Sequence, residues 1–179
     1  MVRFSKKAVF FDRDGVLNLG IVKNGKSYAP KLLKDFKLYP KIKNYSEKLK
    51  KKGFKIIVIT NQPDVGKGKI KKKEILKMHN KLKLEFSYDD IFCSFSKFKK
   101  SYFRKPNPGM ILKAVKKHHI NLGKSFLIGD RWSDISAAEK VNCKSIFIDR
   151  KYKEKTEIFN PTKKVKSLSS AINFIENHL

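Results

Sequence analysis

Short, continuously apolar runs alternate along the chain with segments whose apolar residues recur at helical spacing. The apolar runs are rich in β-branched and aromatic residues, as are strands buried on both faces of a parallel sheet. They are Ala8 to Phe11, Lys55 to Thr60, Ser125 to Gly129 and Lys144 to Ile148, with 90–93 as a weaker further candidate. Strands that alternate with helices favour right-handed crossovers, so the pattern predicts a three-layer α/β sandwich with a mostly parallel sheet.

Between these runs, apolar residues recur every three or four positions, which is the spacing of amphipathic helices. Such stretches cover 42–49, 70–86 and 110–115, and a terminal helix is expected at 167–179. The segment from Leu17 to Pro40 is the least regular and is expected to form a long loop after the first strand. Because ligands of open α/β sheets lie beyond the carboxyl ends of the strands, this loop is expected to border a functional site.

The chain has 179 residues, of which 40% are hydrophobic, enough for one buried core but not for two sizeable ones. We therefore expect a single domain over 1–179, and a monomer. Two cysteines, Cys93 and Cys143, cannot form a disulfide framework, and no apolar run is long enough to cross a membrane. These features predict a cytoplasmic protein with no membrane partner.

The charge balance is strongly basic, with 43 lysines and arginines against 16 acidic residues and a net charge of +27. Such a field attracts phosphates, nucleic acid or acidic lipid. However, 38 of these cations are lysines, whereas base-specific and bidentate phosphate recognition favour arginine. Coding bias alone is an equally good explanation of the excess. The lysine clusters at 50–52, 71–73 and 163–166 are therefore expected on helix surfaces or loops.

Polar residues directly follow three of the predicted strands. Asp12 and Asp14 follow the first, 60–62 end the second, and 130–134 follow the third. Residues two apart in extended backbone project to the same side, so the first two carboxylates repel each other unless a cation lies between them. With Asp130 as a further oxygen donor, the set suits Mg²⁺ better than zinc. The alternative is that each aspartate only caps the following helix.

A carboxylate beside Mg²⁺, with a lysine and a small hydroxyl nearby, is the equipment for phosphoryl transfer. Lys105 and Thr60 could supply the last two groups. There is no GxxxxGK[ST] loop, which argues against ATP bound by a P-loop. A carboxylate nucleophile that forms an aspartyl-phosphate is the chemistry that remains.

Four motifs occur in the order found in the haloacid dehalogenase-like (HAD) phosphohydrolases, which the chain resembles over roughly residues 7–150. They are Asp12-Arg13-Asp14-Gly15-Val16-Leu17, Thr60-Asn61-Gln62, Arg104-Lys105-Pro106 and Gly129-Asp130-Arg131-Trp132-Ser133-Asp134. The DRDG form, Asn18, Gly66-Lys67-Gly68 and the RKPNPGM run look more narrowly like the D-glycero-D-manno-heptose 1,7-bisphosphate 7-phosphatase and histidinol-phosphatase branch. The resemblance implies a HAD-like Rossmannoid three-layer sandwich.

Carried onto matching positions, the resemblance makes Asp12 the nucleophile and Asp14 the general acid, with Thr60 and Lys105 on the transferring phosphoryl group. It implies a Mg²⁺ site formed by Asp12, Asp130 and the backbone carbonyl of Asp14, while Asp134 orients Lys105 or holds metal-bound water. The residues expected to contact the substrate are Arg13, Asn18, Asn61, Gln62, Arg104 and Arg131.

Two features distinguish this chain within that resemblance. About 45 residues separate Asp14 from Thr60, and Thr60 from Lys105, so neither interval admits a separate cap domain and only the loops 17–40 and 63–69 would close the site. The related phosphatases usually carry a zinc-binding loop with Cys-x-His and Cys-x-Cys pairs before the RKP motif. Here Cys93-Ser94-Phe95 and Ser101-Tyr102-Phe103 stand in those places, and one thiol cannot hold structural zinc.

The leading hypothesis is Mg²⁺-dependent hydrolysis of a small phosphorylated metabolite, such as heptose 1,7-bisphosphate, through an aspartyl-phosphate; histidinol phosphate is a related alternative. A nucleic-acid 3′-phosphatase is the first competitor from another substrate class, and a basic groove with exposed aromatic residues leading to the site would favour it. A non-catalytic protein that binds a phosphorylated partner is the third hypothesis, which the intact carboxylates argue against. The histidines, His79 among them, lie away from the motifs and are expected to have surface or packing roles.

Overall fold

The computed structural model describes residues 4–153 and 157–178. The strands are β1 (Ala8–Phe11), β2 (Ile21–Lys23), β3 (Lys26–Tyr28), β4 (Lys55–Asn61), β5 (Asp90–Ser94), β6 (Phe126–Gly129), β7 (Lys144–Ile148) and β8 (Lys163–Val165). The α-helices are α1 (Ile42–Lys51), α2 (Pro63–Gly66), α3 (Lys72–Glu85), α4 (Gly109–His118), α5 (Trp132–Glu139) and α6 (Leu168–Glu176). Two 3₁₀ turns, Leu33–Asp35 and Leu122–Lys124, complete the regular structure of the described ranges.

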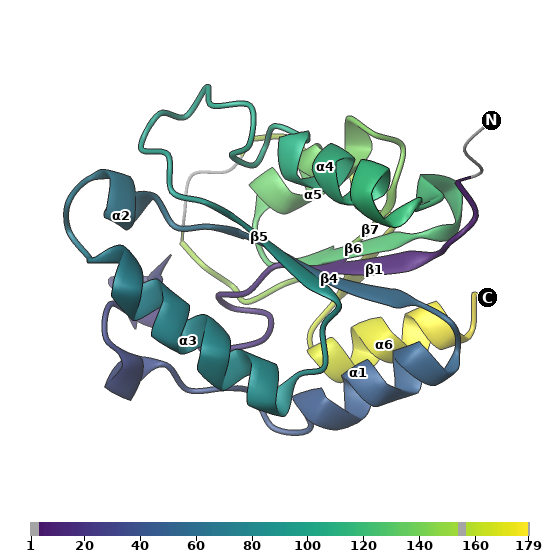
Figure 1. The fold of residues 1–179 in the computed structure, drawn as a ribbon, viewed down its shortest axis with the longest axis horizontal. Helices are drawn as coiled ribbons and strands as arrows, with labels where there is room; N and C mark the ends of the chain where they lie inside the picture. The colour runs from purple at the N-terminus through teal and green to yellow at the C-terminus, as the bar shows by residue number, and fades with distance from the viewer. Residues whose placement is uncertain (1–3, 154–156, 179) are drawn as a thin grey trace.

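Six parallel strands form the main sheet, in the order β5-β4-β1-β6-β7-β8 (Figure 1). The four residues of β1 are completely buried because both faces of the sheet are covered. Val9 and Phe11 pack into the cluster formed with α1, α3 and α6, whereas Ala8 and Phe10 pack into the cluster formed with α4 and α5. Figure 1 shows these two helix layers on opposite sides of the sheet. The predicted three-layer α/β sandwich with a parallel sheet is confirmed.

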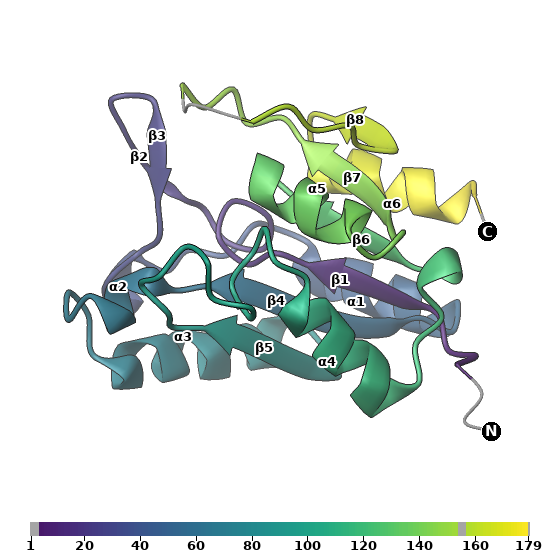
Figure 2. The same ribbon diagram turned by 90° about the horizontal axis from the view of Figure 1, so that it is seen from above.

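The sequence pattern was wrong at two places. The lysine cluster at 163–166 is not on a helix or loop, because Lys163–Val165 forms β8 at the edge of the sheet, where side chains remain largely exposed. The segment 17–40 is not simply a loop, since it contains the antiparallel hairpin β2–β3, which projects from the body of the molecule (Figure 2). Short exposed strands bury too few apolar residues to show a period in the sequence.

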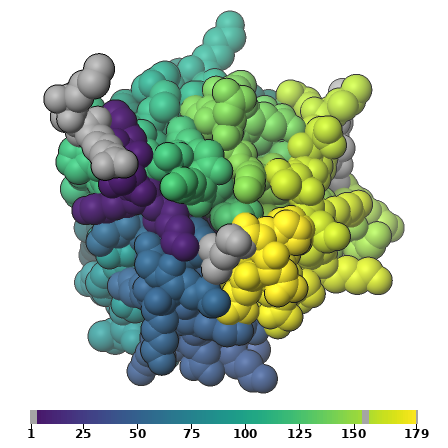
Figure 3. All heavy atoms as spheres, turned by 90° about the vertical axis from the view of Figure 1, so that its right-hand side faces the viewer, coloured from purple at the N-terminus to yellow at the C-terminus, as the bar shows by residue number. Residues whose placement is uncertain are grey.

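Helices α1 and α6 are joined at the surface of the molecule. In Figure 3, α6 lies directly beside α1, and the Lys48 ammonium contacts the Glu176 carboxylate at 2.6 Å. The Ser167 hydroxyl caps α6 by accepting a hydrogen bond from the Ser170 N–H at 3.1 Å. None of the helices described is both long enough and apolar enough to cross a membrane.

Helix α3 buries a histidine against the polar residues that follow β1. The His79 side chain is only 6% exposed, and its Nε2 has no hydrogen-bond partner among the described residues. Burial and the nearby Arg13 guanidinium together lower the pKa of His79 from 6.5 to about 4, against the opposing effect of the Asp14 carboxylate. The imidazole is therefore neutral in the folded protein at neutral pH, and His79 does not lie away from the motifs as the sequence suggested.

His79 should make the free energy of unfolding depend on pH below neutrality. The unfolded chain binds the imidazole proton at pH values where the folded chain does not, so this contribution is complete above about pH 6.5 and is lost as the pH falls toward about 4. Between about pH 4 and pH 6.5, His79 should change the free energy of unfolding by about 3 kcal/mol. Urea unfolding of His79→Gln should lack this part of the pH dependence. His119→Gln, at an exposed position, is the matched control and should retain it.

Candidate active site

Three neighbouring strands bring the predicted residues together at one edge of the sheet. In the register of the sheet, Phe11 at the end of β1 lies opposite Val58 of β4 and Ile128 of β6. The first residue beyond β1, Asp12, donates its backbone N–H to the Ile128 carbonyl at 2.9 Å. Asp130 follows β6 directly in the same way. The carboxyl ends of these parallel strands therefore place acidic side chains from distant segments of the chain side by side.

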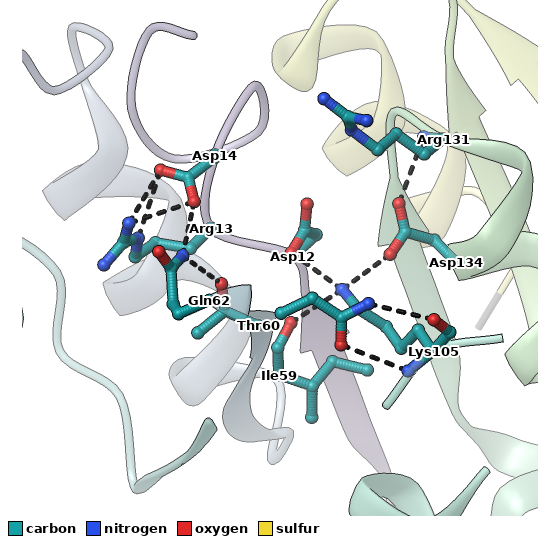
Figure 4. Close-up of polar contacts among 10 residues, drawn as sticks. Asp12, Arg13, Asp14, Ile59, Thr60, Gln62, Lys105, Arg131 and Asp134 are labelled. Atoms are coloured by element: carbon teal, nitrogen blue, oxygen red, sulfur yellow. Dashed lines mark hydrogen bonds and ion pairs between the residues drawn. The ribbon is translucent and has the colours of Figure 1, made fainter. Parts of the chain in front are cut away.

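Lys105 is the cation at the centre of this arrangement (Figure 4). Its ammonium contacts Asp12 Oδ1 at 2.7 Å and Asp134 Oδ1 at 2.6 Å, and it donates to the Ile59 carbonyl at 2.9 Å. The lysine is 4% exposed, and burial alone would lower its pKa, but the two carboxylates outweigh burial and raise the pKa. Lys105 is therefore charged at neutral pH.

Asn61 fixes the backbone from which Lys105 projects. Its Nδ2 donates to the Lys105 carbonyl at 2.9 Å, and its Oδ1 accepts from the Lys105 N–H at 3.1 Å. Both ends of the amide are thus used to attach the loop after β5 to the end of β4. This pairing orients the lysine toward Asp12 rather than toward solvent.

Asp12, Asp130 and Asp134 form a buried acidic triad whose ligand atoms lie within 4.8 Å of one another. Lys105 pairs with two of them. The Tyr152 hydroxyl lies near the Asp130 carboxylate, but neither oxygen of Asp130 makes a hydrogen bond of normal geometry with a described residue. Burial raises the pKa of Asp130 well above its usual range, and Asp12 and Asp134 raise it further. Burial likewise raises the pKa of Asp12 to about 6, against the opposing effect of Lys105. Orphaned buried oxygens in an all-carboxylate cluster suit a hard divalent cation such as Mg²⁺.

Asp14 is turned away from the acidic triad and is held by three other side chains (Figure 4). Arg13 binds it through Nη2 at 2.9 Å to each carboxylate oxygen and through Nε at 3.2 Å to Oδ1. Asn18 donates to Oδ1 at 3.0 Å, and Gln62 donates to Oδ2 at 2.6 Å and to the Thr60 hydroxyl at 2.9 Å. The position of Asp14 is therefore determined by a network that also reaches Thr60.

Arg13 does not have the position expected of a substrate-binding residue. Its side chain is completely buried behind Asp14, and its guanidinium lies 5.2 Å from the centre of the Phe36 ring. In this structure Arg13 therefore supports Asp14, and its contact with substrate stays a prediction. Asn18, Asn61 and Gln62 are also engaged with Asp14 or Lys105, and substrate contact remains a prediction for them.

The two remaining arginines predicted to contact substrate lie at the rim. Arg104 donates through Nη1 to the carbonyls of Ser96 and Lys97, at 3.0 and 2.8 Å, so part of its guanidinium holds its own loop. Arg131 donates through Nη2 to the Ser27 carbonyl at 2.6 Å and so attaches α5 to the hairpin β2–β3. Their contact with substrate remains a prediction.

Two residues of the segment after β7 reach the site without having been predicted. Arg150 donates through Nε to the Gly15 carbonyl at 2.9 Å, and its guanidinium lies 4.5 Å from the centre of the Tyr39 ring. Burial raises the pKa of the Tyr152 hydroxyl, and the nearby Asp130 carboxylate raises it further. Arg150 is one of only five arginines in a lysine-rich chain, a signal that could have found it. Tyr152 carries no such signal.

The chain is similar in sequence to known hydrolases. The family model for haloacid dehalogenase-like hydrolases matches residues 21–148. The D-glycero-beta-D-manno-heptose-1,7-bisphosphate 7-phosphatase of Helicobacter pylori is 33% identical over 148 residues, which cover 79% of this chain and 82% of that protein. The D-glycero-alpha-D-manno-heptose-1,7-bisphosphate 7-phosphatase of Photorhabdus laumondii is 35% identical over 156 residues, covering 79% of this chain and 81% of that protein.

A solved structure shares the fold across nearly the whole chain. The D,D-heptose 1.7-bisphosphate phosphatase from B. bronchiseptica, crystallised with magnesium and phosphate, is similar with a TM-score of 0.82 at 20% sequence identity. The likeness covers 97% of this chain and 99% of that one. The family model spans more than half of the present chain, and both curated relatives exceed 30% identity. The chain therefore belongs to the haloacid dehalogenase-like hydrolase family and is a phosphoric monoester hydrolase.

Proposed function

We propose that the protein is a Mg²⁺-dependent phosphatase of a small phosphorylated sugar, with heptose 1,7-bisphosphate as the first candidate. The observation that carries the proposal is the acidic triad, in which Lys105 pairs with Asp12 and Asp134 while neither oxygen of Asp130 has a hydrogen-bond partner among the residues that the structure describes. Asp12, Asp130 and Asp134 would hold the ion, with the Asp14 backbone carbonyl. Bound there, Mg²⁺ would supply positive charge to the phosphoryl oxygens.

In the proposed reaction Asp12 attacks the phosphorus atom and the ester bond to the sugar oxygen breaks. Lys105 contacts Oδ1 of Asp12, so Oδ2 is the oxygen outside that ion pair. The departing alkoxide takes a proton from Asp14, and water then cleaves the aspartyl-phosphate with Asp14 as base. The Thr60 hydroxyl and the Lys105 ammonium would bind the phosphoryl oxygens; Thr60 as a residue is 1% exposed. Asp14 must leave the Arg13 pair to reach a leaving group.

A small substrate is supported by the openness of the architecture and by the relatives. Between β1 and α1 the described chain adds only the hairpin β2–β3 and a 3₁₀ turn, and no separate cap domain covers the site (Figure 2). Two relatives named for opposite anomers of heptose bisphosphate have similar identity to this chain, so the anomer is left open. A cytoplasmic location is part of the same proposal, because sugar phosphates are made and used there.

A phosphate-release screen would test the substrate. The panel should contain both heptose 1,7-bisphosphate anomers, hexose phosphates, histidinol phosphate and a 3′-phosphorylated oligonucleotide, each with Mg²⁺ in excess. We expect the highest kcat/KM of the panel for one of the heptose bisphosphates. A higher value for the oligonucleotide than for every metabolite would replace it with the nucleic-acid 3′-phosphatase hypothesis.

Replacing the nucleophile should abolish the reaction. Asp12→Asn keeps the size of the side chain but removes the attacking carboxylate, so phosphate release should fall by more than about 10³-fold. Asp35→Asn, at an exposed position of the turn 33–35, should keep full activity. Activity of Asp12→Asn within tenfold of wild type would exclude covalent catalysis by this residue.

Phosphate release should require Mg²⁺, and Asp130 should be needed for tight binding of the ion. EDTA should stop phosphate release, and added Mg²⁺ should restore it. In Asp130→Asn the Mg²⁺ concentration for half-maximal activity should rise at least about tenfold, since a buried ligand loses its charge. Mg²⁺ should also raise the Tm of the wild type more than that of this variant. Equal Mg²⁺ responses of the two proteins would contradict the assignment.

Arg13 should affect turnover more than substrate binding. Arg13→Lys keeps the positive charge but cannot reproduce the two-pronged contact with Asp14, so kcat should fall at least about tenfold while KM changes little. The variant should also be less stable, because it weakens a buried ion pair. A large rise in KM with unchanged kcat would instead support the prediction that Arg13 contacts the substrate.

A further inference from the structure

The loop between β5 and α4 presents three aromatic side chains to solvent. Phe98 is 68% exposed, Tyr102 55% and Phe103 45%, and we call these three residues the aromatic ridge. Cations lie beside the rings: the Lys97 ammonium is 5.4 Å from the centre of the Phe98 ring, and the Lys113 ammonium is 5.7 Å from that of Phe103. Large exposed aromatic side chains grouped on one loop indicate a binding surface.

The charge around the aromatic ridge differs from that of the rest of the chain. Residues 91–129 contain eight lysines and one arginine but no aspartate or glutamate. All 16 acidic residues lie elsewhere, whereas the average of the chain would place about three in a stretch of this length. An excess of lysine codons explains many lysines, but it does not explain why this stretch has no acidic residue of its own. Of its lysines, Lys105 and Lys117 pair with aspartates that lie outside the stretch. The surface is therefore suited to a polyanion.

A recess of about 400 Å³ adjoins the aromatic ridge, a volume in the range of sites for small organic groups. Its lining includes Ser94, Phe95, Ser101, Phe103, Met110 and Lys113. The loop is ordered by its own polar contacts, because Arg104 donates to the Ser96 and Lys97 carbonyls and Asn107 donates to the Ser101 carbonyl at 3.1 Å. The rings and the recess are thus held in place without a ligand.

We propose that the aromatic ridge and its recess bind single-stranded nucleic acid. Bases would stack on Phe98, Tyr102 and Phe103, while lysines interleaved with these rings contact the backbone phosphates. Aromatic rings alone would suit an apolar peptide, and lysines alone would suit a duplex or an anionic membrane. Rings and cations that alternate along a stretch with no acidic residue of its own match the requirements of a single strand.

This binding surface adjoins the proposed catalytic site but does not depend on it. Arg104 at the end of the loop is followed directly by Lys105, and the Ser94 carbonyl in the recess accepts from the Gln62 N–H at 2.7 Å. In Figure 1 the loop projects from the end of the sheet to which these residues belong. Binding can be measured in EDTA with a strand that carries no terminal phosphate, so its outcome is separate from that of the phosphatase assays.

The first test concerns stacking. Fluorescein-labelled oligothymidylate of about 15 nucleotides is titrated with the full chain in EDTA and low salt, and anisotropy is recorded. Phe98→Ala should weaken binding at least about fivefold, while Phe98→Trp should retain it. Leu84→Ala, which removes another exposed apolar side chain, should have no effect. Absence of binding by the wild type, or equal affinity of Phe98→Ala and wild type, would overturn the proposal.

The second test separates local contacts from the general positive field. Lys99→Ser/Lys100→Ser and Lys51→Ser/Lys52→Ser each remove two exposed adjacent lysines and change the net charge equally. Only the first pair should lower the slope of log affinity against log salt, by about 1.4. If the two double variants lowered the slope equally, the attraction would be non-specific, and the proposed binding surface would be overturned. Binding of duplex DNA as tight as that of the single strand would overturn it as well.

Discussion

The buried ammonium of Lys105 is the contact on which the candidate site depends. It joins Asp12, which follows β1, to Asp134 in α5, although Lys105 itself comes from the loop after β5. These three residues are at most 7% exposed, and each charged side chain would lose several kcal/mol of solvation if it were buried alone. Mutual attraction offsets this cost only in the observed geometry, so the ion pairs fix the relative positions of three segments that are far apart in sequence.

The same ion pairs leave an imbalance of charge that defines the chemistry. One ammonium faces three carboxylates, and the oxygens of Asp130 are the ones left without a partner among the described residues. The raised pKa values of Asp12 and Asp130 express this imbalance, because burial and mutual repulsion favour protonation of the acids. A divalent cation in the triad would replace those protons, so metal binding and deprotonation of the nucleophile are linked.

The sequence predicted those parts of the molecule in which burial or strand ends impose a regular pattern. The runs that became β1, β4, β6 and β7 are continuously apolar because both of their faces are covered, and the polar residues after β1, β4 and β6 stand out against apolar neighbours. The strand Lys163–Val165 and the hairpin β2–β3 bury little and carry no such pattern. The burial of Arg13 and the approach of Tyr152 to Asp130 depend on packing between distant segments, which motif spacing cannot show.

The loop before Lys105 shows how a chain can hold this active-site geometry without a metal crosslink. The resemblance places a zinc-binding loop here, yet Cys93 has no further cysteine or histidine with which to form a ligand group in the part of the chain described. Arg104 instead bonds two carbonyls of the loop, and Asn61 attaches the adjoining backbone to β4. Hydrogen bonds from a guanidinium tolerate more change in loop shape than tetrahedral coordination does. The outer surface of the loop can therefore vary, here with exposed aromatic residues, while Lys105 stays between Asp12 and Asp134.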